Sequence, residues 1–126
     1  VGGRLHLYGG DRDAGAIAAA RDNAARAGVA EQIAFACRAL SATEFPPTPG
    51  WVITNPPYGL RVGAAKDLRA LYAQLGKLLR ARAPGWRFAV LCSDRGLLDQ
   101  MGLPISQRFS LVNGGVSVTL AVGQVP

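Results

Sequence analysis

The sequence predicts an α/β fold, with a mostly parallel sheet and an antiparallel hairpin at its C-terminal edge. Over most of the 126 residues, short apolar runs alternate with stretches of strong helix formers, as in parallel sheets whose strands are joined by helices. Near the end this alternation stops, and two strand-like runs flank Asn-Gly-Gly at residues 113–115, a strong hairpin signal. A chain of this length forms one domain or part of one.

The expected elements follow one another through short connections. Asp13 is placed to cap the first helix and Gly28 to end it. Leucines at helical spacing predict a long amphipathic helix that ends before Pro84 and Gly85. In chain order we expect strands at 4–8, 33–37, 51–54 and 87–92, helices at 14–27, 66–83 and from 93 or 94 to 101, and a hairpin of 107–111 with 116–122.

The composition argues against several classes of protein. Cys37 and Cys92 stand far apart without a partner motif, so we expect neither a disulfide framework nor a metal site, and a reducing cytoplasm fits. No uncharged apolar run is long enough to cross a bilayer. The formal net charge of +6 suits a polyanionic partner, although charge alone is weak evidence because many solvated faces are basic.

The most informative stretch is Asn-Pro-Pro-Tyr, which follows the apolar run at 51–54, interpreted as a buried strand. Pro56 keeps Asn55 out of the helical region, and the two prolines fix φ and remove two backbone donors. The Asn55 side-chain oxygen and a proline carbonyl can both accept from an exocyclic amine, while Tyr58 lies flat on the ring that carries it. The competing interpretation is a tight turn, since Asn and Pro favour turns for local reasons.

Two aspartates are expected just past strands, where ligands of parallel sheets bind. Asp11 follows the first strand, and a carboxylate there suits the two hydroxyls of a ribose; a turn or a helix cap is its alternative, with Asp13 competing for the cap. Asp94 either lines the same rim or caps a helix. His6 is expected inside the first strand in a structural role, and Cys92 is expected to be a core thiol.

The aspartate after the first strand and the Asn-Pro-Pro-Tyr stretch, with their flanking residues, resemble those of a known family. The chain is similar to class I S-adenosylmethionine-dependent methyltransferases, and within them to the guanine-N2 RNA methyltransferases that carry a THUMP domain upstream. The resemblance spans nearly the whole chain and implies a Rossmann-like sheet. It is carried by Tyr-Gly-Gly-Asp-Arg-Asp at 8–13, by Asn-Pro-Pro-Tyr-Gly at 55–59 with Arg61, by Leu-Tyr at 71–72 and by the Asn-Gly hairpin at 113–114.

The resemblance implies a cofactor, a substrate and a set of site residues. It implies direct methyl transfer from S-adenosylmethionine to the exocyclic N2 amine of guanine in ribosomal or transfer RNA. Three alternatives stay open: an adenine-N6 methyltransferase, a protein glutamine-N5 methyltransferase, and a non-catalytic RNA-binding fragment. The implied base-binding residues are Asn55, Pro56, Pro57 and Tyr58, the cofactor-binding residues are Asp11, Arg12, Ala39 and Asn55, and Arg61 is the RNA contact.

The chain departs from the family pattern at two places. Ala39 stands where family members carry an aspartate that contacts the adenine amine, so an adenine contact there would come from backbone atoms. The family's glycine-rich loop precedes the ribose-binding acid by a strand, a turn and a helix, whereas only Val-Gly-Gly at 1–3 precedes the first strand here. Residues 1–126 are therefore expected to be the C-terminal portion of a methyltransferase catalytic domain, without its central glycine-loop strand and without a THUMP domain.

Overall fold

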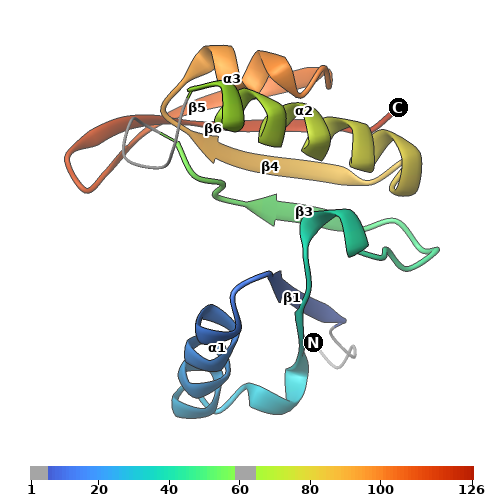
Figure 1. The fold of residues 1–126 in the computed structure, drawn as a ribbon, viewed down its shortest axis with the longest axis vertical. Helices are drawn as coiled ribbons and strands as arrows, with labels where there is room; N and C mark the ends of the chain where they lie inside the picture. Colours follow the sequence, from blue (N-terminus) through green and yellow to red (C-terminus); the bar gives the residue numbers. More distant parts are fainter. Residues whose placement is uncertain (1–5, 59–64) are drawn as a thin grey trace. The chain divides into compact units, whose positions relative to one another are not determined.

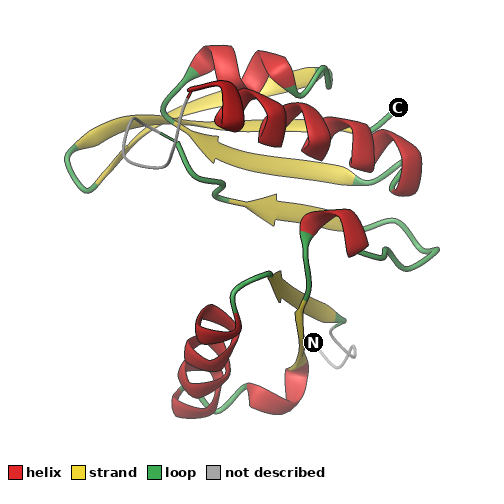
Figure 2. Ribbon diagram, viewed as in Figure 1, coloured by secondary structure: helices red, strands yellow, loops and turns green. Residues whose placement is uncertain are grey.

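The computed structural model describes residues 6–58 and 65–126. The chain divides into two compact units, Val1–Glu44 and Phe45–Pro126, here called the N-terminal and C-terminal units. Each unit has its own sheet, one of two strands and one of four (Figures 1 and 2). Among the described residues, no helix combines the length and the apolar character needed to cross a membrane.

The N-terminal unit is a single strand–helix–strand segment. Asp13 caps its helix, accepting at Oδ1 from the Gly15 N–H at 3.0 Å, and Gly28 follows the helix with φ of +74°, so the predicted start and stop are both confirmed. The two strands pair in parallel. The elements are β1 (Leu7–Asp11), α1 (Ala14–Arg26), the short 3₁₀ turns η1 (Ala30–Gln32) and η2 (Leu40–Ala42), and, between these turns, β2 (Ile33–Cys37).

The first strand lies later in the sequence than predicted. The expectation of a strand over 4–8 placed His6 inside it, and this was wrong: His6 is exposed and precedes β1. The two glycines that follow do not end the strand, because Gly9 pairs with Phe35 and a Cβ on Gly9 would lie 2.8 Å from the Phe35 ring. A glycine inside a strand often marks such a close approach. As a result Asp11 is the last residue of β1.

The C-terminal unit is a mixed sheet of order β3-β4-β6-β5, in which only the first pair is parallel. Gly114 and Gly115 join the last two strands with φ of 57° and 82°, as a two-residue type I′ turn requires. This confirms the α/β fold class and the hairpin, whose strands are longer than expected. The elements are β3 (Trp51–Thr54), α2 (Ala65–Arg82), β4 (Arg87–Cys92), α3 (Arg95–Gln100), β5 (Ile105–Asn113) and β6 (Val116–Gln124).

The core of the C-terminal unit forms where α2 and α3 pack on β4. Helices α2 and α3 approach closely at Gly76, where a Cβ would lie 1.8 Å from the Met101 carbonyl oxygen. One turn further along α2, Arg80 donates to the Met101 and Gly102 carbonyls at 2.8 and 3.0 Å, which satisfies acceptors at the end of α3. The largest fully buried side chains of the unit are Tyr72, Leu79, Phe88, Val90, Cys92, Leu98, Met101 and Val125.

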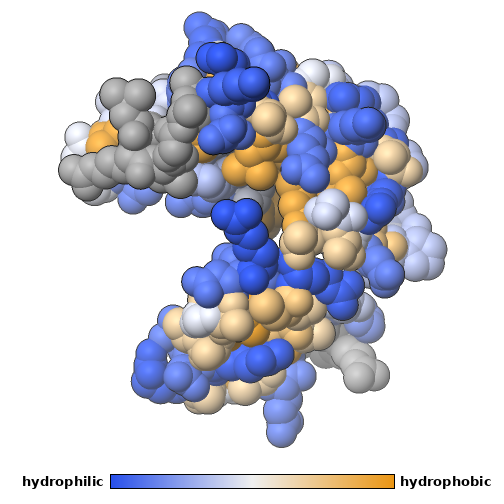
Figure 3. All heavy atoms as spheres, in the orientation of Figure 1, coloured by the Kyte–Doolittle hydropathy of each residue, from blue (hydrophilic) through white to orange (hydrophobic). Residues whose placement is uncertain are grey.

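Strand β3 is not the buried strand that its apolar run predicted. Trp51 is 49% and Ile53 is 76% exposed, because β3 lies at the edge of its sheet with β4 as its one ladder partner among the described residues. The Arg87 guanidinium lies 5.5 Å from the centroid of the Trp51 ring and covers part of it. Figure 3 shows apolar residues of this unit exposed among hydrophilic ones.

The contact at Gly76 gives a test of the helix packing. Gly76→Ala should lower the free energy of unfolding by about 2 kcal/mol, because the backbone of Met101 must move to admit the methyl group. This loss exceeds the gain of about 1 kcal/mol that alanine brings to a helix. The measurement is urea unfolding followed by circular dichroism.

The matched control for that test is Gly15→Ala in the first turn of α1. There a Cβ would meet its nearest neighbour, Asp13 Oδ1, at 3.4 Å, an ordinary contact, so stability should hold or rise. A Gly76→Ala protein as stable as the unsubstituted chain would contradict the packing described here.

Candidate functional site

The Asn-Pro-Pro-Tyr loop leaves the carboxyl end of β3, as the sequence predicted. Asn55 and Pro57 are exposed, whereas Pro56 and Tyr58 are half-buried. The asparagine amide is therefore open to solvent at the rim of the sheet, and the tyrosine is partly packed. This arrangement leaves the groups proposed to hold a base accessible to a ligand.

The loop is tied to the core by a hydroxyl that sequence reasoning did not single out. Tyr72 Oη donates to the Pro57 carbonyl at 3.3 Å, although the Tyr72 side chain is 0% exposed on α2. The same hydroxyl lies 3.3 Å from Cys92 Sγ at the end of β4. In the sequence, Tyr72 belongs to the Leu-Tyr pair at 71–72 that carries the family resemblance, but no role was assigned to its hydroxyl. The sequence does contain a signal for this contact, since a single tyrosine stands in a row of leucines. The hydroxyl of a buried tyrosine needs a hydrogen-bond partner.

The Tyr72 hydroxyl is held in its neutral form. Burial raises the pKa of Tyr72 far above its usual range, and the hydrogen bond to Cys92 raises it further. Removal from water disfavours the charged phenolate, so burial favours the protonated hydroxyl of Tyr72. A protonated hydroxyl can donate a hydrogen bond to a carbonyl, and Tyr72 does so to the Pro57 carbonyl of the loop.

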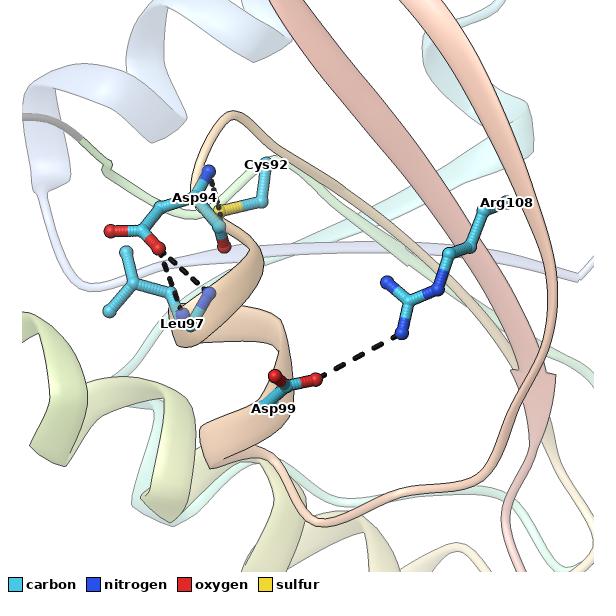
Figure 4. A network of polar contacts seen from close by, with 6 residues as sticks. Cys92, Asp94, Leu97, Asp99 and Arg108 are labelled. Carbon is cyan, nitrogen blue, oxygen red and sulfur yellow. Dashed lines mark hydrogen bonds and ion pairs between the residues drawn. The ribbon is translucent and has the colours of Figure 1, made fainter.

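Asp94 caps a helix, which decides between the two roles considered for it. Its Oδ1 accepts from the Gly96 and Leu97 N–H groups at 2.8 and 3.3 Å (Figure 4). Its own N–H donates to Cys92 Sγ at 3.3 Å, and the Cys92 thiol donates to the Asp94 carbonyl at 3.4 Å. Cys92 is fully buried, as expected for a core thiol. The start of α3 and the end of β4 are thus joined directly.

Arg108 faces a carboxylate of the protein. Its guanidinium lies 3.9 Å from Asp99 of α3 (Figure 4). Both side chains are partly exposed, and an ion pair of this kind contributes little to stability.

In the N-terminal unit, Asp11 occupies the carboxyl end of β1 and is exposed. Its Oδ1 accepts from the Asp13 N–H at 2.8 Å, so it braces the turn into α1, while Asp13 provides the cap. A carboxylate has about four acceptor positions, and one internal hydrogen bond leaves capacity for two hydroxyls. The free acceptor positions of Asp11 at this strand end therefore fit the two hydroxyls of a ribose.

Other candidate cofactor residues lie close to Asp11 in the fold of the same unit. Arg12 follows it in the chain and accepts at its carbonyl from the Cys37 thiol at 3.5 Å. The Arg38 N–H donates to the Asp11 carbonyl at 2.9 Å, which brings the end of β2 beside the end of β1. Ala39 is exposed and precedes η2. Arg61, the candidate RNA contact, lies outside the described residues.

Comparisons with known proteins show the family to which the chain belongs. The family model described as RMKL-like, methyltransferase domain, matches residues 3–122. The chain belongs to this family. The resemblance inferred from the motifs is thereby confirmed, and Asp11 and the Asn-Pro-Pro-Tyr loop both lie within the match.

Relatives of this RMKL-like methyltransferase domain are much longer than the chain itself. The ribosomal RNA large subunit methyltransferase K/L of Shewanella oneidensis is 39% identical over 112 residues. That alignment covers 89% of this chain and 16% of the relative. The chain thus corresponds to a limited part of the relative.

Solved structures support the fold of this RMKL-like methyltransferase domain. SMU.472, a methyltransferase crystallised in complex with SAH, has a TM-score of 0.90 at 25% identity, over 98% of this chain and 32% of its own. A protein of Listeria monocytogenes described as an N6-adenine-specific DNA methylase has a TM-score of 0.83 at 28% identity, over 98% of this chain and 31% of its own. The α/β fold with a mostly parallel sheet and added antiparallel strands is common to them.

The capping role of Asp94 is testable by substitution. Asp94→Ala should lower the free energy of unfolding by about 1 kcal/mol, because two N–H groups of α3 lose their acceptor. Asp94→Asn is the matched control and should change stability by only a few tenths of a kcal/mol, since asparagine caps equally well. Thermal or urea unfolding measures both, and equal losses for the two variants would argue against the capping role.

Proposed function

We propose that this chain is part of an S-adenosylmethionine-dependent RNA methyltransferase that modifies the exocyclic N2 amine of a guanine. The observation that carries the proposal is one family match, over residues 3–122, that contains both an acid at a strand end and the Asn-Pro-Pro-Tyr loop. The relative named a ribosomal RNA large subunit methyltransferase supports ribosomal RNA as the substrate, with transfer RNA as the related possibility. A cytoplasmic location follows from such a substrate.

Methyl transfer to such an amine requires hydrogen-bond acceptors and a flat stacking surface from the loop. The lone pair of a guanine amine is delocalised into the ring, so this nitrogen is a poor nucleophile. The Asn55 amide oxygen and the Pro56 carbonyl would accept hydrogen bonds from the two amine N–H groups and turn the lone pair out of the ring plane. Fixed dipoles at these positions offset the positive charge that develops on nitrogen, so catalysis rests on positioning and electrostatics.

The base must leave its stack to reach such a loop. Extruding a base costs a few kcal/mol, and stacking on an aromatic ring offsets part of that cost. Tyr58 is half-buried and supplies that ring. The net charge of +6 favours approach of the RNA backbone, and Arg61 is the proposed RNA contact within the loop sequence.

The cofactor would bind at the strand ends of the N-terminal unit. S-adenosylmethionine supplies a methyl group on a sulfonium, which needs no metal. The Asp11 carboxylate, already braced by the Asp13 N–H, would accept from both ribose hydroxyls. Arg12 follows this aspartate in the chain, and Ala39 follows Arg38, whose N–H donates to the Asp11 carbonyl. Asn55 is the proposed residue shared by cofactor and base.

We also propose that the chain works as the C-terminal portion of a larger catalytic domain. The sheet edges support this, because β1 and β3 each have one ladder partner among the described residues. Both carry exposed apolar residues, among them Tyr8 and Ile53. A further parallel strand that carries the glycine-rich loop would satisfy an exposed edge of this kind, with a THUMP domain further upstream.

A second candidate is methylation of adenine N6. The likeness to the Listeria monocytogenes protein described as an N6-adenine-specific DNA methylase favours it. It would use the same loop, since an adenine amine also needs two acceptors and a stacking ring. A methylation assay across ribosomal RNA, transfer RNA, DNA and a protein glutamine substrate separates these activities, and no transfer to any of them would favour a non-catalytic RNA-binding role.

Substitution of Asn55 tests the base-binding role. Asn55→Ala in the full-length protein should lower turnover by roughly two orders of magnitude or more, comparable to the loss of a positioned polar group. Cofactor affinity should be largely retained, because the proposed contact of the Asn55 amide with the cofactor is secondary to its contact with the base. Asn23→Ala, an exposed asparagine on α1, is the control and should keep full turnover. Undiminished turnover by Asn55→Ala would refute the role.

Substitution of Asp11 tests the cofactor role. Asp11→Ala in the full-length protein should weaken S-adenosylmethionine binding by about 1.5–3 kcal/mol, the range for hydrogen bonds to a charged group. Asp11→Asn keeps an oxygen that can accept from the Asp13 N–H, so it distinguishes an effect of the disrupted turn from an effect of the removed charge. Asp22→Ala on α1 controls for the change in net charge. Titration calorimetry measures the affinity, and an unchanged value for Asp11→Ala would exclude the ribose contact.

A further inference from the structure

We propose that Tyr72 is a positioning residue for the base-binding loop, acting through its hydrogen bond to the Pro57 carbonyl. The inference deepens the proposed function and rests on it, because it concerns how the same loop is held ready for a base. Tyr72 touches neither base nor cofactor in this scheme. It contributes by fixing the backbone that carries the acceptors.

The loop has few means of attachment to the core. Pro56 and Pro57 lack backbone N–H groups, so neither residue can be tied down by donating a hydrogen bond. Their carbonyls are the remaining polar backbone groups, and an anchor must therefore be a donor that comes from elsewhere. Tyr72 Oη is such a donor, at 3.3 Å from the Pro57 oxygen and fully buried.

The Tyr72 hydroxyl has a second polar neighbour besides the Pro57 carbonyl. The Tyr72 hydroxyl lies 3.3 Å from Cys92 Sγ, and that sulfur accepts from the Asp94 N–H at 3.3 Å. A thiol is a weaker acceptor than a carbonyl, so the Tyr72 proton favours Pro57, and the sulfur completes the polar surroundings of the hydroxyl. The loop after β3 is in this way joined to α2, to the end of β4 and to the start of α3.

Fixing one carbonyl restricts the neighbouring acceptors. Proline holds φ near one value, so ψ is the main free backbone angle at each of the two prolines. The hydrogen bond from Tyr72 limits ψ at Pro57, and this limits the directions open to the adjoining peptide. The Pro56 carbonyl and the Asn55 side chain, the two proposed acceptors, then start from one geometry, which is the condition for catalysis by positioning.

The decisive variant is Tyr72→Phe, which removes the hydroxyl and keeps the ring. In the full-length protein, kcat for RNA methylation should fall about 10-fold or more, while the affinity for S-adenosylmethionine stays within twofold. Leu79→Val is the matched control, because Leu79 is also fully buried on α2 but lies two turns away from Tyr72. It weakens the core without touching the loop, so kcat should stay near that of the unsubstituted protein.

A spectroscopic readout tests the anchor without any methylation. With ¹³C-carbonyl-labelled proline, the Pro57 resonance should move upfield in Tyr72→Phe, because its carbonyl loses a donor, and should stay in place in Leu79→Val. An unmoved resonance, or equal losses of kcat in the two variants at matched unfolding midpoints, would overturn the proposal. If the unsubstituted protein methylates no guanine, the proposed function fails, and the Pro57 resonance still decides whether Tyr72 anchors the loop.

Discussion

The C-terminal unit depends on the burial of β4. This strand pairs in parallel with β3 and antiparallel with β6, and Phe88, Val90 and Cys92 along it are fully buried. Close packing around it leaves no room for extra atoms: a Cβ on Gly123 of β6 would lie 2.2 Å from the Pro104 carbonyl oxygen and 2.5 Å from the Phe88 ring. Because interiors packed at this density transmit small displacements, β4 sets the position of β3 and of the loop that leaves β3.

The Asn-Pro-Pro-Tyr loop, which we propose binds the base, therefore gains its order from elements remote in sequence. Two successive prolines make the loop stiff but deprive it of donors, and the core supplies the missing hydrogen bond through Tyr72. Desolvation keeps that hydroxyl neutral by raising its pKa. A site that accepts an amine needs unoccupied acceptors at its surface, so an anchor that uses only the Pro57 carbonyl is compatible with the proposed chemistry.

The N-terminal unit follows a different principle, since its candidate site is organised locally. Asp13 caps α1, and Asp11 accepts a hydrogen bond that stabilises the turn before it. Each of these two nearby carboxylates therefore stabilises a different part of the connection. The Arg38 N–H ties the end of β2 to the Asp11 carbonyl. A carboxylate at a strand end with one internal hydrogen bond retains the capacity that a diol requires. Asp11 and the Asn-Pro-Pro-Tyr loop, which both lie within the range matched by the RMKL-like family, are thus held by two differently stabilised units.

The sequence by itself determined the local features of this protein. The cap at Asp13, the stop at Gly28, the Gly-Gly hairpin turn and the stiff Asn-Pro-Pro-Tyr loop all follow from backbone preferences within a few residues, and the fold class follows from their order. Only the tertiary structure decided what depends on distant partners. Gly9 continues β1 because of the Phe35 ring, Trp51 and Ile53 are exposed because β3 is an edge, and Tyr72 meets Pro57 because α2 packs over β4. An apolar or helical pattern records the period of an element but not its neighbours, and these neighbours determine burial and hydrogen bonding.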